Sequence, residues 1–158
     1  LANTSIETTP AQQKERGARS SLKKSVRLDD LRVLLVDDDR DAREMLTILL
    51  REYGADVVSA SSSAEALTLI ECEDVDVIVS DIGMPHEDGY HFIHQVREQK
   101  ANRNSRKPAV ALTGFTRSVD RMRVLAAGFH SHVAKPVDAR ELAVVLASLT
   151  GRLKFENS

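Results

Sequence analysis

Val75-Asp-Val-Ile-Val-Ser-Asp-Ile-Gly-Met-Pro-His-Glu-Asp-Gly89 is the stretch that decides the fold class of this chain. It opens with a short run of apolar, β-branched residues, which is typical of a strand buried on both faces of a sheet. The run ends in Ser80 and Asp81, and the glycines and the proline that follow favour turns and loops. The stretch therefore predicts that a buried strand delivers the carboxylate of Asp81 to the C-terminal edge of a sheet, where open α/β sheets bind their ligands.

The pattern of a strand followed by a helix occurs five times along the chain. Short apolar strands are predicted over residues 31–36, 56–60, 75–79, 109–112 and 131–134. Apolar residues at helical spacing follow each of them, within residues 42–53, 62–70, 89–100, 119–128 and 138–150. This alternation predicts an α/β fold in which helices cover both faces of a parallel sheet and the crossovers are right-handed. Periodicity alone does not give the order of the strands.

Length and composition limit the classes to which the chain can belong. Its 158 residues are enough for one domain with a sizeable core, and 42% hydrophobic and 29% charged residues are ordinary for a globular protein. No apolar run is long enough to span a bilayer, and no basic start with an apolar middle indicates a signal peptide. Cys72 is the only cysteine, which excludes an internal disulfide. We therefore predict a cytoplasmic location without membrane contact.

Charge divides the chain into segments. Residues 1–28 carry six basic and two acidic side chains in a polar sequence, and we predict that they form a flexible basic linker or tail. A basic tail can contact nucleic acid, but this one lacks the aromatic residues on which single strands stack, so no nucleic-acid partner is predicted. The folded domain is predicted over residues 29–150, and residues 151–158 are a short C-terminal tail. The pattern leaves the oligomeric state open.

Four predicted strands end in polar side chains that can act together. The first ends in Asp37 and Asp38, the third in Asp81, the fourth in Thr113 and the fifth in Lys135. In a parallel sheet all of these ends meet at one edge. Two carboxylates about 4 Å apart repel each other by roughly 4 kcal/mol at an effective dielectric constant of about 20, so this edge needs positive charge. Lys135 supplies one charge, and Mg²⁺, which binds carboxylates together with water and phosphate oxygens, is the cofactor that this set predicts.

A carboxylate beside a metal ion, a lysine and a hydroxyl group is typical of phosphoryl transfer. An aspartate can act as the nucleophile and form an aspartyl phosphate. The transition state spreads negative charge over three oxygens, so positioning and cations contribute most of the catalysis. We predict that Mg²⁺ binds one of these oxygens, Lys135 a second, and Thr113 with nearby backbone N–H groups the third.

Several motifs carry a resemblance to a known family, and their joint spacing makes it specific. The motifs are Val36-Asp37-Asp38, Ser80-Asp81-Ile82-Gly83-Met84-Pro85 with Asp88-Gly89, Leu112-Thr113-Gly114, Ala127-Gly128 and Lys135-Pro136. On these motifs the chain from about residue 31 to residue 149 resembles the response-regulator receiver domain of two-component signalling. The resemblance implies a flavodoxin-like, five-stranded parallel sheet in the order 2-1-3-4-5, with helices on both faces.

The resemblance also implies a role for each acidic residue. Asp81 is the expected phosphoacceptor, which takes its phosphoryl group from a phosphohistidine of a histidine kinase or a histidine phosphotransfer domain. Asp38, Asp81 and the backbone carbonyl group of Gly83 are the implied direct ligands of Mg²⁺. Asp37 is implied to act on the metal mainly through water.

Thr113 and Lys135 are the residues implied to contact the phosphoryl group. Phosphorylation would draw Thr113 toward that group and shift the surface of the fourth helix, fifth strand and fifth helix, which partners recognise. Gly83, Phe115 and His132 depart from the commonest pattern of the family. The first two offer no polar side chain to assist hydrolysis, which predicts a long-lived phosphorylated state. His132 stands where many members have the switching aromatic residue.

We therefore predict a phosphoacceptor receiver module of a phosphorelay, which itself catalyses only its own phosphorylation and dephosphorylation. The start at Leu1 and the basic N-terminal segment favour a receiver that is part of a hybrid histidine kinase, and a free-standing, single-domain response regulator is the alternative. A Mg²⁺-dependent phosphatase is a second alternative, because Asp37 and Asp39 have the spacing of an aspartate nucleophile and its acid/base. A degenerate receiver that only binds partners is a third.

Overall fold

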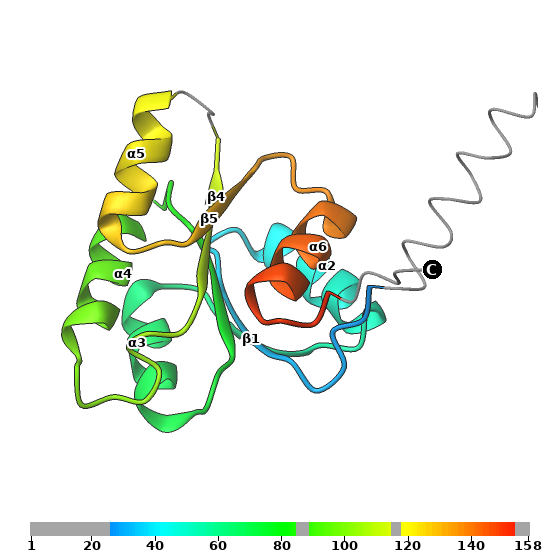
Figure 1. Cartoon of the computed structure of the whole chain (residues 1–158), viewed down its shortest axis with the longest axis horizontal. Helices are drawn as coiled ribbons and strands as arrows, with labels where there is room; N and C mark the ends of the chain where they lie inside the picture. Colours follow the sequence, from blue (N-terminus) through cyan, green and yellow to red (C-terminus); the bar gives the residue numbers. More distant parts are fainter. Residues whose placement is uncertain (1–25, 85–88, 115–117, 154–158) are drawn as a thin grey trace, which may run out of the picture.

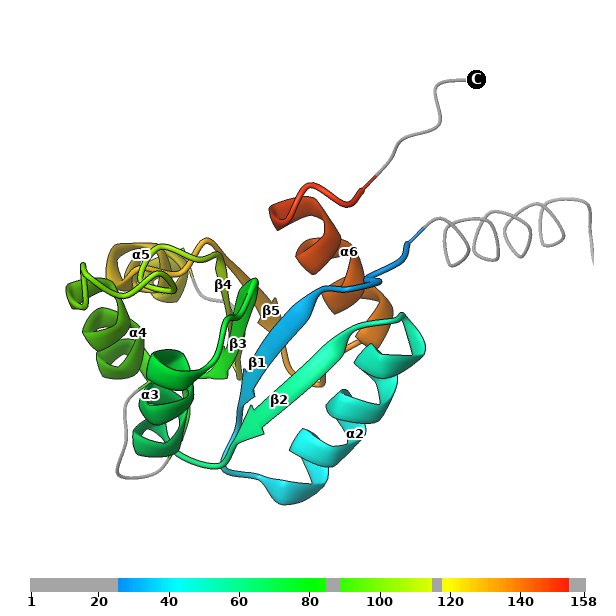
Figure 2. The same ribbon diagram turned by 90° about the horizontal axis from the view of Figure 1, so that it is seen from below.

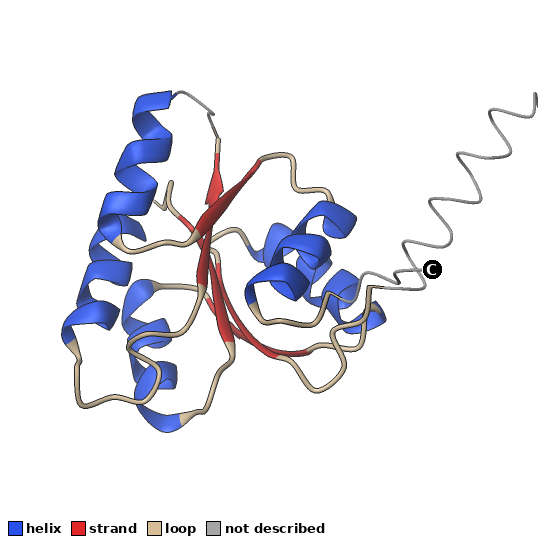
Figure 3. Ribbon diagram, in the orientation of Figure 1, coloured by secondary structure: helices blue, strands red, loops and turns tan. Residues whose placement is uncertain are grey.

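The computed structural model describes residues 26–84, 89–114 and 118–153, with only the backbone described at residues 118–120. Strands and helices alternate along these residues, as Figures 1 and 3 show. No helix in these ranges has the length and apolar character that crossing a membrane requires. The elements are β1 (Arg32–Val36), α2 (Arg40–Glu52), β2 (Asp56–Ala60), α3 (Ser63–Cys72), β3 (Val77–Asp81), α4 (Gly89–Glu98), β4 (Ala109–Thr113), α5 (Ser118–Ala127), β5 (Ser131–Ala134) and α6 (Ala139–Leu149).

The five strands form one parallel sheet in the order β2-β1-β3-β4-β5. Helices α2 and α6 cover one face of this sheet, and α3, α4 and α5 cover the other (Figures 1 and 2). The flavodoxin-like order and the two helical layers that we predicted are thus confirmed. The chain leaves β1 toward β2 on one side and returns to β3 on the other. The C-terminal ends of β1 and β3 therefore flank the crevice in which sheets of this kind bind ligands.

The central strands are apolar along almost their whole length because both of their faces are covered. In β1, Val33 and Leu35 belong to the core under α2 and α6, whereas Leu34 and Val36 belong to the core under α3, α4 and α5. All four side chains are fully buried. Packing on both faces fixes the positions of the strand ends, and these ends carry the polar residues that we predicted to act together.

The strands extend far enough to include two of these polar residues. β3 ends at Asp81 and β4 ends at Thr113, whereas the apolar pattern placed both residues just after their strands. In the sheet register Asp81 pairs with Leu112, and Thr113 pairs with Ala134. The backbones of both residues are therefore held by neighbouring strands, which positions their side chains more firmly than a loop would.

Side-chain caps begin three of the helices. Asp39, Ser62 and Asp138 accept hydrogen bonds from backbone N–H groups in the first turns of α2, α3 and α6. These contacts satisfy N–H groups that have no partner inside a helix. At α3 the carboxylate of Glu65 accepts the N–H and hydroxyl groups of Ser61, so it reaches one residue further back than in an ordinary capping box.

The packed domain begins further toward the N-terminus than the composition predicted. Val26 and Leu28 are buried in the core under α2 and α6, and the N–H group of Leu28 donates to the carbonyl oxygen of Tyr53 at 2.8 Å. Within the described residues the core therefore includes two positions before residue 29, and the composition did not reveal them because two apolar residues in a polar segment give no periodic signal. Residues 1–25 and 154–158 lie outside the described residues, so the flexible linker and the C-terminal tail stay predictions.

Candidate functional site

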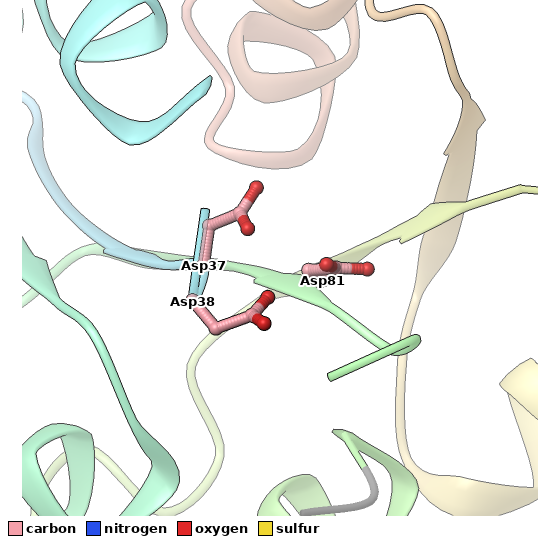
Figure 4. A group of neighbouring side chains, drawn as sticks. All are labelled: Asp37, Asp38 and Asp81. Atoms are coloured by element: carbon pink, nitrogen blue, oxygen red, sulfur yellow. The ribbon is translucent and has the colours of Figure 1, made fainter. Parts of the chain in front are cut away.

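Three carboxylates meet at the C-terminal edge of the sheet. Asp37 and Asp38 follow β1, and Asp81 is the last residue of β3. One oxygen atom from each of them lies within 4.8 Å of the other two, and Figure 4 shows the three side chains around the two strand ends. Asp37 and Asp81 are buried, with 1% and 4% of their surface exposed, whereas Asp38 is exposed. The structure therefore brings together the carboxylates that the strand pattern predicted to converge.

Lys135 and Thr113 lie at the same edge, beside Asp81. The Nζ atom of Lys135 is 2.9 Å from Asp81 Oδ2, and the backbone N–H group of Lys135 donates to the carbonyl oxygen of Thr113 at 2.7 Å. Thr113 is 2% exposed, and its hydroxyl group has no hydrogen-bond partner among the described residues. Because a buried hydroxyl group without a partner is costly, this group is suited to bind an oxygen of a ligand at the edge.

The surroundings of Asp37 hold its carboxylate in one orientation. Its backbone N–H group donates to the carbonyl oxygen of Ala60, and its Oδ1 atom accepts the N–H group of Asp39 at 2.9 Å. Its Oδ2 atom is buried and has no partner in the described part of the chain. Burial is the main cause that raises the pKa of Asp37 to about 6. The charge of Asp81 acts in the same direction, and the charge of Lys135 opposes it.

The turn after β3 packs against the carboxylate of Asp81. The N–H group of Gly83 donates to Asp81 Oδ1 at 2.9 Å, and Gly89, the first residue of α4, lies against the backbone of the same turn. A Cβ atom on Gly89 would come within 2.7 Å of the Asp81 carbonyl oxygen and within 2.6 Å of Ile82 Cα. Only a residue without a side chain fits there. The sequence pattern marked Gly89 as a turn residue and contained no sign of this contact.

The donor set fits Mg²⁺. This ion prefers hard oxygen ligands, and carboxylates are the usual protein source of them. Three carboxylate oxygens lie within 4.8 Å of one another, and within the described ranges the buried Oδ2 atom of Asp37 has no other partner. Asp37, Asp38 and Asp81 are therefore the residues that would hold such an ion.

The sequence matches the family described as the response regulator receiver domain over residues 33–147. The chain belongs to this family. The matched region runs from the second residue of β1 to within two residues of the end of α6, so it takes in at least part of every strand and helix of the described fold. Receiver domains of two-component systems accept phosphoryl groups from histidine kinases or phosphotransfer proteins and bind Mg²⁺ at an acidic pocket. The predicted resemblance is therefore confirmed.

Proteins similar to this receiver differ widely in length. The uncharacterized 14.6 kDa protein in the sodA1 3' region of Leptolyngbya boryana is 42% identical over 115 residues, which are 73% of this chain and 86% of that protein. The sensor protein GacS of Pseudomonas syringae pv. syringae is 33% identical over 121 residues, which are 76% of this chain and 13% of that protein. The structure of the receiver domain of the Francisella response regulator 1452 is 30% identical with a TM-score of 0.71, and the match covers 79% of this chain and 100% of that one.

The geometry of the receiver does not support the phosphatase alternative. Asp39, which that alternative requires as the acid/base, is exposed, and its Oδ1 atom accepts the N–H groups of Asp41 and Ala42. Its carboxylate therefore caps α2, and Asp38 joins Asp37 in the acidic cluster instead. The complete acidic cluster also argues against a degenerate receiver.

Two of the positions that depart from the commonest family pattern, His132 and Phe115, stand differently in the structure. His132 is partly buried in β5, where it pairs with Ala111. Phe115 lies outside the described residues, so the prediction of slow hydrolysis stays a prediction. Arg43 is a residue of the site that the sequence did not reveal. Its Nη1 atom donates to the carbonyl oxygen of Asp37 at 2.7 Å. The only available signal was its position in the second turn of the helix that follows Asp37.

Proposed function

We propose that this receiver accepts a phosphoryl group on Asp81 from the phosphohistidine of a histidine kinase or a histidine phosphotransfer domain. The observation that carries the proposal is the contact of 2.9 Å between Lys135 Nζ and Asp81 Oδ2. On the side of Asp81 where β1 ends, Asp37 and Asp38 contribute carboxylate oxygens within 4.8 Å. A nucleophilic carboxylate between a cation and a metal-binding cluster is the arrangement that phosphoryl transfer to aspartate requires.

In the proposed step, an oxygen of Asp81 forms a bond to phosphorus while the bond from phosphorus to the histidine nitrogen breaks. The imidazole leaves with the electron pair of the broken bond. Lys135 then pairs with one phosphoryl oxygen and the hydroxyl group of Thr113 donates to another, so both stabilise charge that grows during transfer. The protein itself catalyses only this phosphorylation and the later hydrolysis.

Mg²⁺, when bound, would neutralise charge on the phosphoryl oxygens. The proposed direct ligands are the carboxylates of Asp38 and Asp81 and the backbone carbonyl group of Gly83, with Asp37 acting mainly through water. Gly83 is exposed and has no side chain that could position an attacking water molecule. We therefore propose a long-lived phosphorylated state, and rapid loss of the phosphoryl group from the purified protein would contradict it.

The test is the intact mass of the protein after incubation with acetyl phosphate and Mg²⁺. We expect one added phosphoryl group in the wild type and none in Asp81→Asn. Asp39→Asn is the matched control, because it removes a nearby carboxylate that caps α2 and asparagine caps helices equally well. No uptake by the wild type, or uptake by Asp81→Asn at the wild-type level, would contradict the proposal.

Two contexts are proposed for the receiver. Its similarity to GacS, of which it spans 13%, supports a receiver within a hybrid histidine kinase. Its similarity to the short Leptolyngbya boryana protein, of which it spans 86%, supports the alternative of a free-standing response regulator. Immunoblotting of the native source with an antibody against this domain separates them, since a hybrid kinase is several times larger than the receiver alone.

We also propose that α5, β5 and α6 form the surface that partners recognise after phosphorylation. Met122 and Leu125 on α5 support this, because 72% and 52% of their surface is exposed although both are apolar. The cytoplasmic location, for which the single cysteine is the argument, likewise stays a proposal.

A further inference from the structure

Arg43 connects α2 to the backbone of the acidic cluster. It lies in the second turn of α2, and its Nη1 atom donates to the carbonyl oxygen of Asp37 at 2.7 Å. The side chain is partly buried, so this charge-assisted hydrogen bond is shielded from competing water. Neither the motifs of the sequence nor the acidic cluster itself includes this arginine.

The contact completes a set that holds Asp37 on several sides. Its N–H group donates to Ala60, its Oδ1 atom accepts the N–H group of Asp39, and its carbonyl oxygen accepts Arg43. The Oδ2 atom is the one oxygen of this residue without a partner among the residues described. The three contacts come from β2, from the turn before α2 and from α2 itself. Of the three, only the contact from Arg43 is made by a side chain, so a substitution can remove it.

We infer that Arg43 is a positioning residue for Mg²⁺ binding, which acts by fixing the backbone turn that presents Asp37 and Asp38. This inference rests on the proposed function, because it assumes that the acidic cluster binds Mg²⁺. Residues that orient metal ligands through hydrogen bonds typically change metal affinity by about 10- to 100-fold when they are replaced. Arg43 touches no proposed ligand side chain, so its effect passes through the backbone of Asp37.

The direction in which Mg²⁺ affinity changes when Arg43 is replaced distinguishes a positioning role of this residue from a simple effect of its charge. Because Arg43 reaches the backbone of Asp37, its positive charge would repel a cation bound at the acidic cluster, so removal of that charge alone would strengthen Mg²⁺ binding. Loss of positioning would weaken it. Arg40 provides the matched control, since it lies on the same helix and pairs with the exposed Glu44 at 3.0 Å rather than with Asp37.

The experiment is a calorimetric Mg²⁺ titration of the wild type, Arg43→Gln, Arg43→Lys and Arg40→Gln. The titration is run at a temperature at which every variant is folded without metal, and denaturant unfolding curves check this. Under that condition a mere loss of stability leaves the measured Kd unchanged. We expect the Kd of Arg43→Gln to rise about tenfold. Arg43→Lys, which keeps a donor of shorter reach, should recover part of the affinity, and Arg40→Gln should bind as tightly as the wild type or slightly more tightly.

An unchanged or lowered Kd in Arg43→Gln would overturn the inference while leaving the proposed function intact. The same holds if Arg43→Gln and Arg40→Gln weaken binding equally. A wild type that binds no Mg²⁺ would instead overturn the proposed function, and the inference with it.

Discussion

Lys135 and Asp81 form an ion pair across the sheet, with Nζ 2.9 Å from Oδ2, although β4 separates the strand of Asp81 from the strand that precedes Lys135. The pair forms because all three strands end at the same edge. The side chain of Asp81 is 6% exposed and that of Lys135 is 37% exposed. The carboxylate of Asp81 is therefore largely shielded from water, whereas the side chain of Lys135 is partly in contact with it.

The first prediction concerns Lys135→Gln. We expect phosphorylation by acetyl phosphate to slow by about 100-fold or more, because a preorganised cation is lost where negative charge develops. We also expect Mg²⁺ to bind more tightly, since one positive charge beside the carboxylates is gone. Lys100→Gln, which removes an exposed lysine after α4, is the control for net charge. Weaker Mg²⁺ binding by Lys135→Gln would show that this lysine organises the metal site, contrary to our view.

The second prediction is a pH dependence of stability that comes from Asp37. Its pKa is raised from 3.8 to about 6 in the folded protein, so the folded state binds more protons than the unfolded state between these values. The stability that this proton contributes is fully present below pH 3.8 and is lost as the pH rises through 6. The loss amounts to at most about 3 kcal/mol.

Chemical unfolding with EDTA at pH 5 and pH 7.5 measures this effect, and Asp37→Asn isolates it. His130 acts in the opposite direction, because burial lowers its pKa and the protein loses stability as the pH falls below the unfolded value of that histidine. The quantity to compare is therefore the difference between the wild type and Asp37→Asn. The free energy of unfolding of Asp37→Asn minus that of the wild type should become more positive from pH 5 to pH 7.5. A difference that does not change with pH would contradict the prediction.

The third prediction concerns the first residue of α4. Helix propensity alone predicts that Gly89→Ala stabilises the protein by about 1 kcal/mol. The new Cβ atom, however, would lie 2.6 Å from Ile82 Cα and 2.7 Å from the carbonyl oxygen of Asp81. Both are backbone atoms, so relief of this overlap requires a shift of the main chain, which costs free energy. We expect a net loss of about 1–3 kcal/mol in urea unfolding. Gly114→Ala is the matched control, since nothing lies within 4 Å of a Cβ atom there.

The fourth prediction concerns Arg97 in α4, which holds together segments at the far end of the sheet. Its guanidinium group donates to the carbonyl oxygens of Ser105, Lys107 and Gly128 at distances from 2.7 to 3.1 Å, and burial lowers its pKa. Replacement of Arg97 by Met leaves these carbonyl groups without this donor. We expect a loss of about 2–4 kcal/mol in thermal or urea unfolding, with phosphorylation of the folded protein unchanged.

Arg103→Met is the comparison for this fourth prediction. Arg103 pairs with Asp74, and both side chains are more than 60% exposed. An exposed ion pair contributes less than about 1 kcal/mol, so this variant should unfold almost like the wild type. Equal losses of unfolding free energy in Arg97→Met and Arg103→Met would contradict the prediction that the buried hydrogen bonds of Arg97 stabilise the fold.

The meeting of these polar side chains at one edge of the sheet could be predicted because each follows a recognisable strand. Asp38, Asp81 and Lys135 stand at the ends of apolar runs, and parallel strands bring their ends to one edge whatever the rest of the sequence is. The contacts between segments could not be predicted in the same way. Arg43 reaches the carbonyl oxygen of Asp37 and Gly89 lies against that of Asp81, and neither contact leaves any pattern in the residue types.

The sequence by itself determined the α/β class, the five-fold alternation and the residue types at the strand ends, since apolar periodicity and turn residues are local properties of the chain. Only the tertiary structure decided that Val26 belongs to the core, that the Oδ2 atom of Asp37 is left without a partner among the described residues, and that Lys135 pairs with Asp81. These features depend on distances between atoms that are far apart in the sequence. Such distances are set by the packing of helices on both faces of the sheet, and no local pattern encodes them.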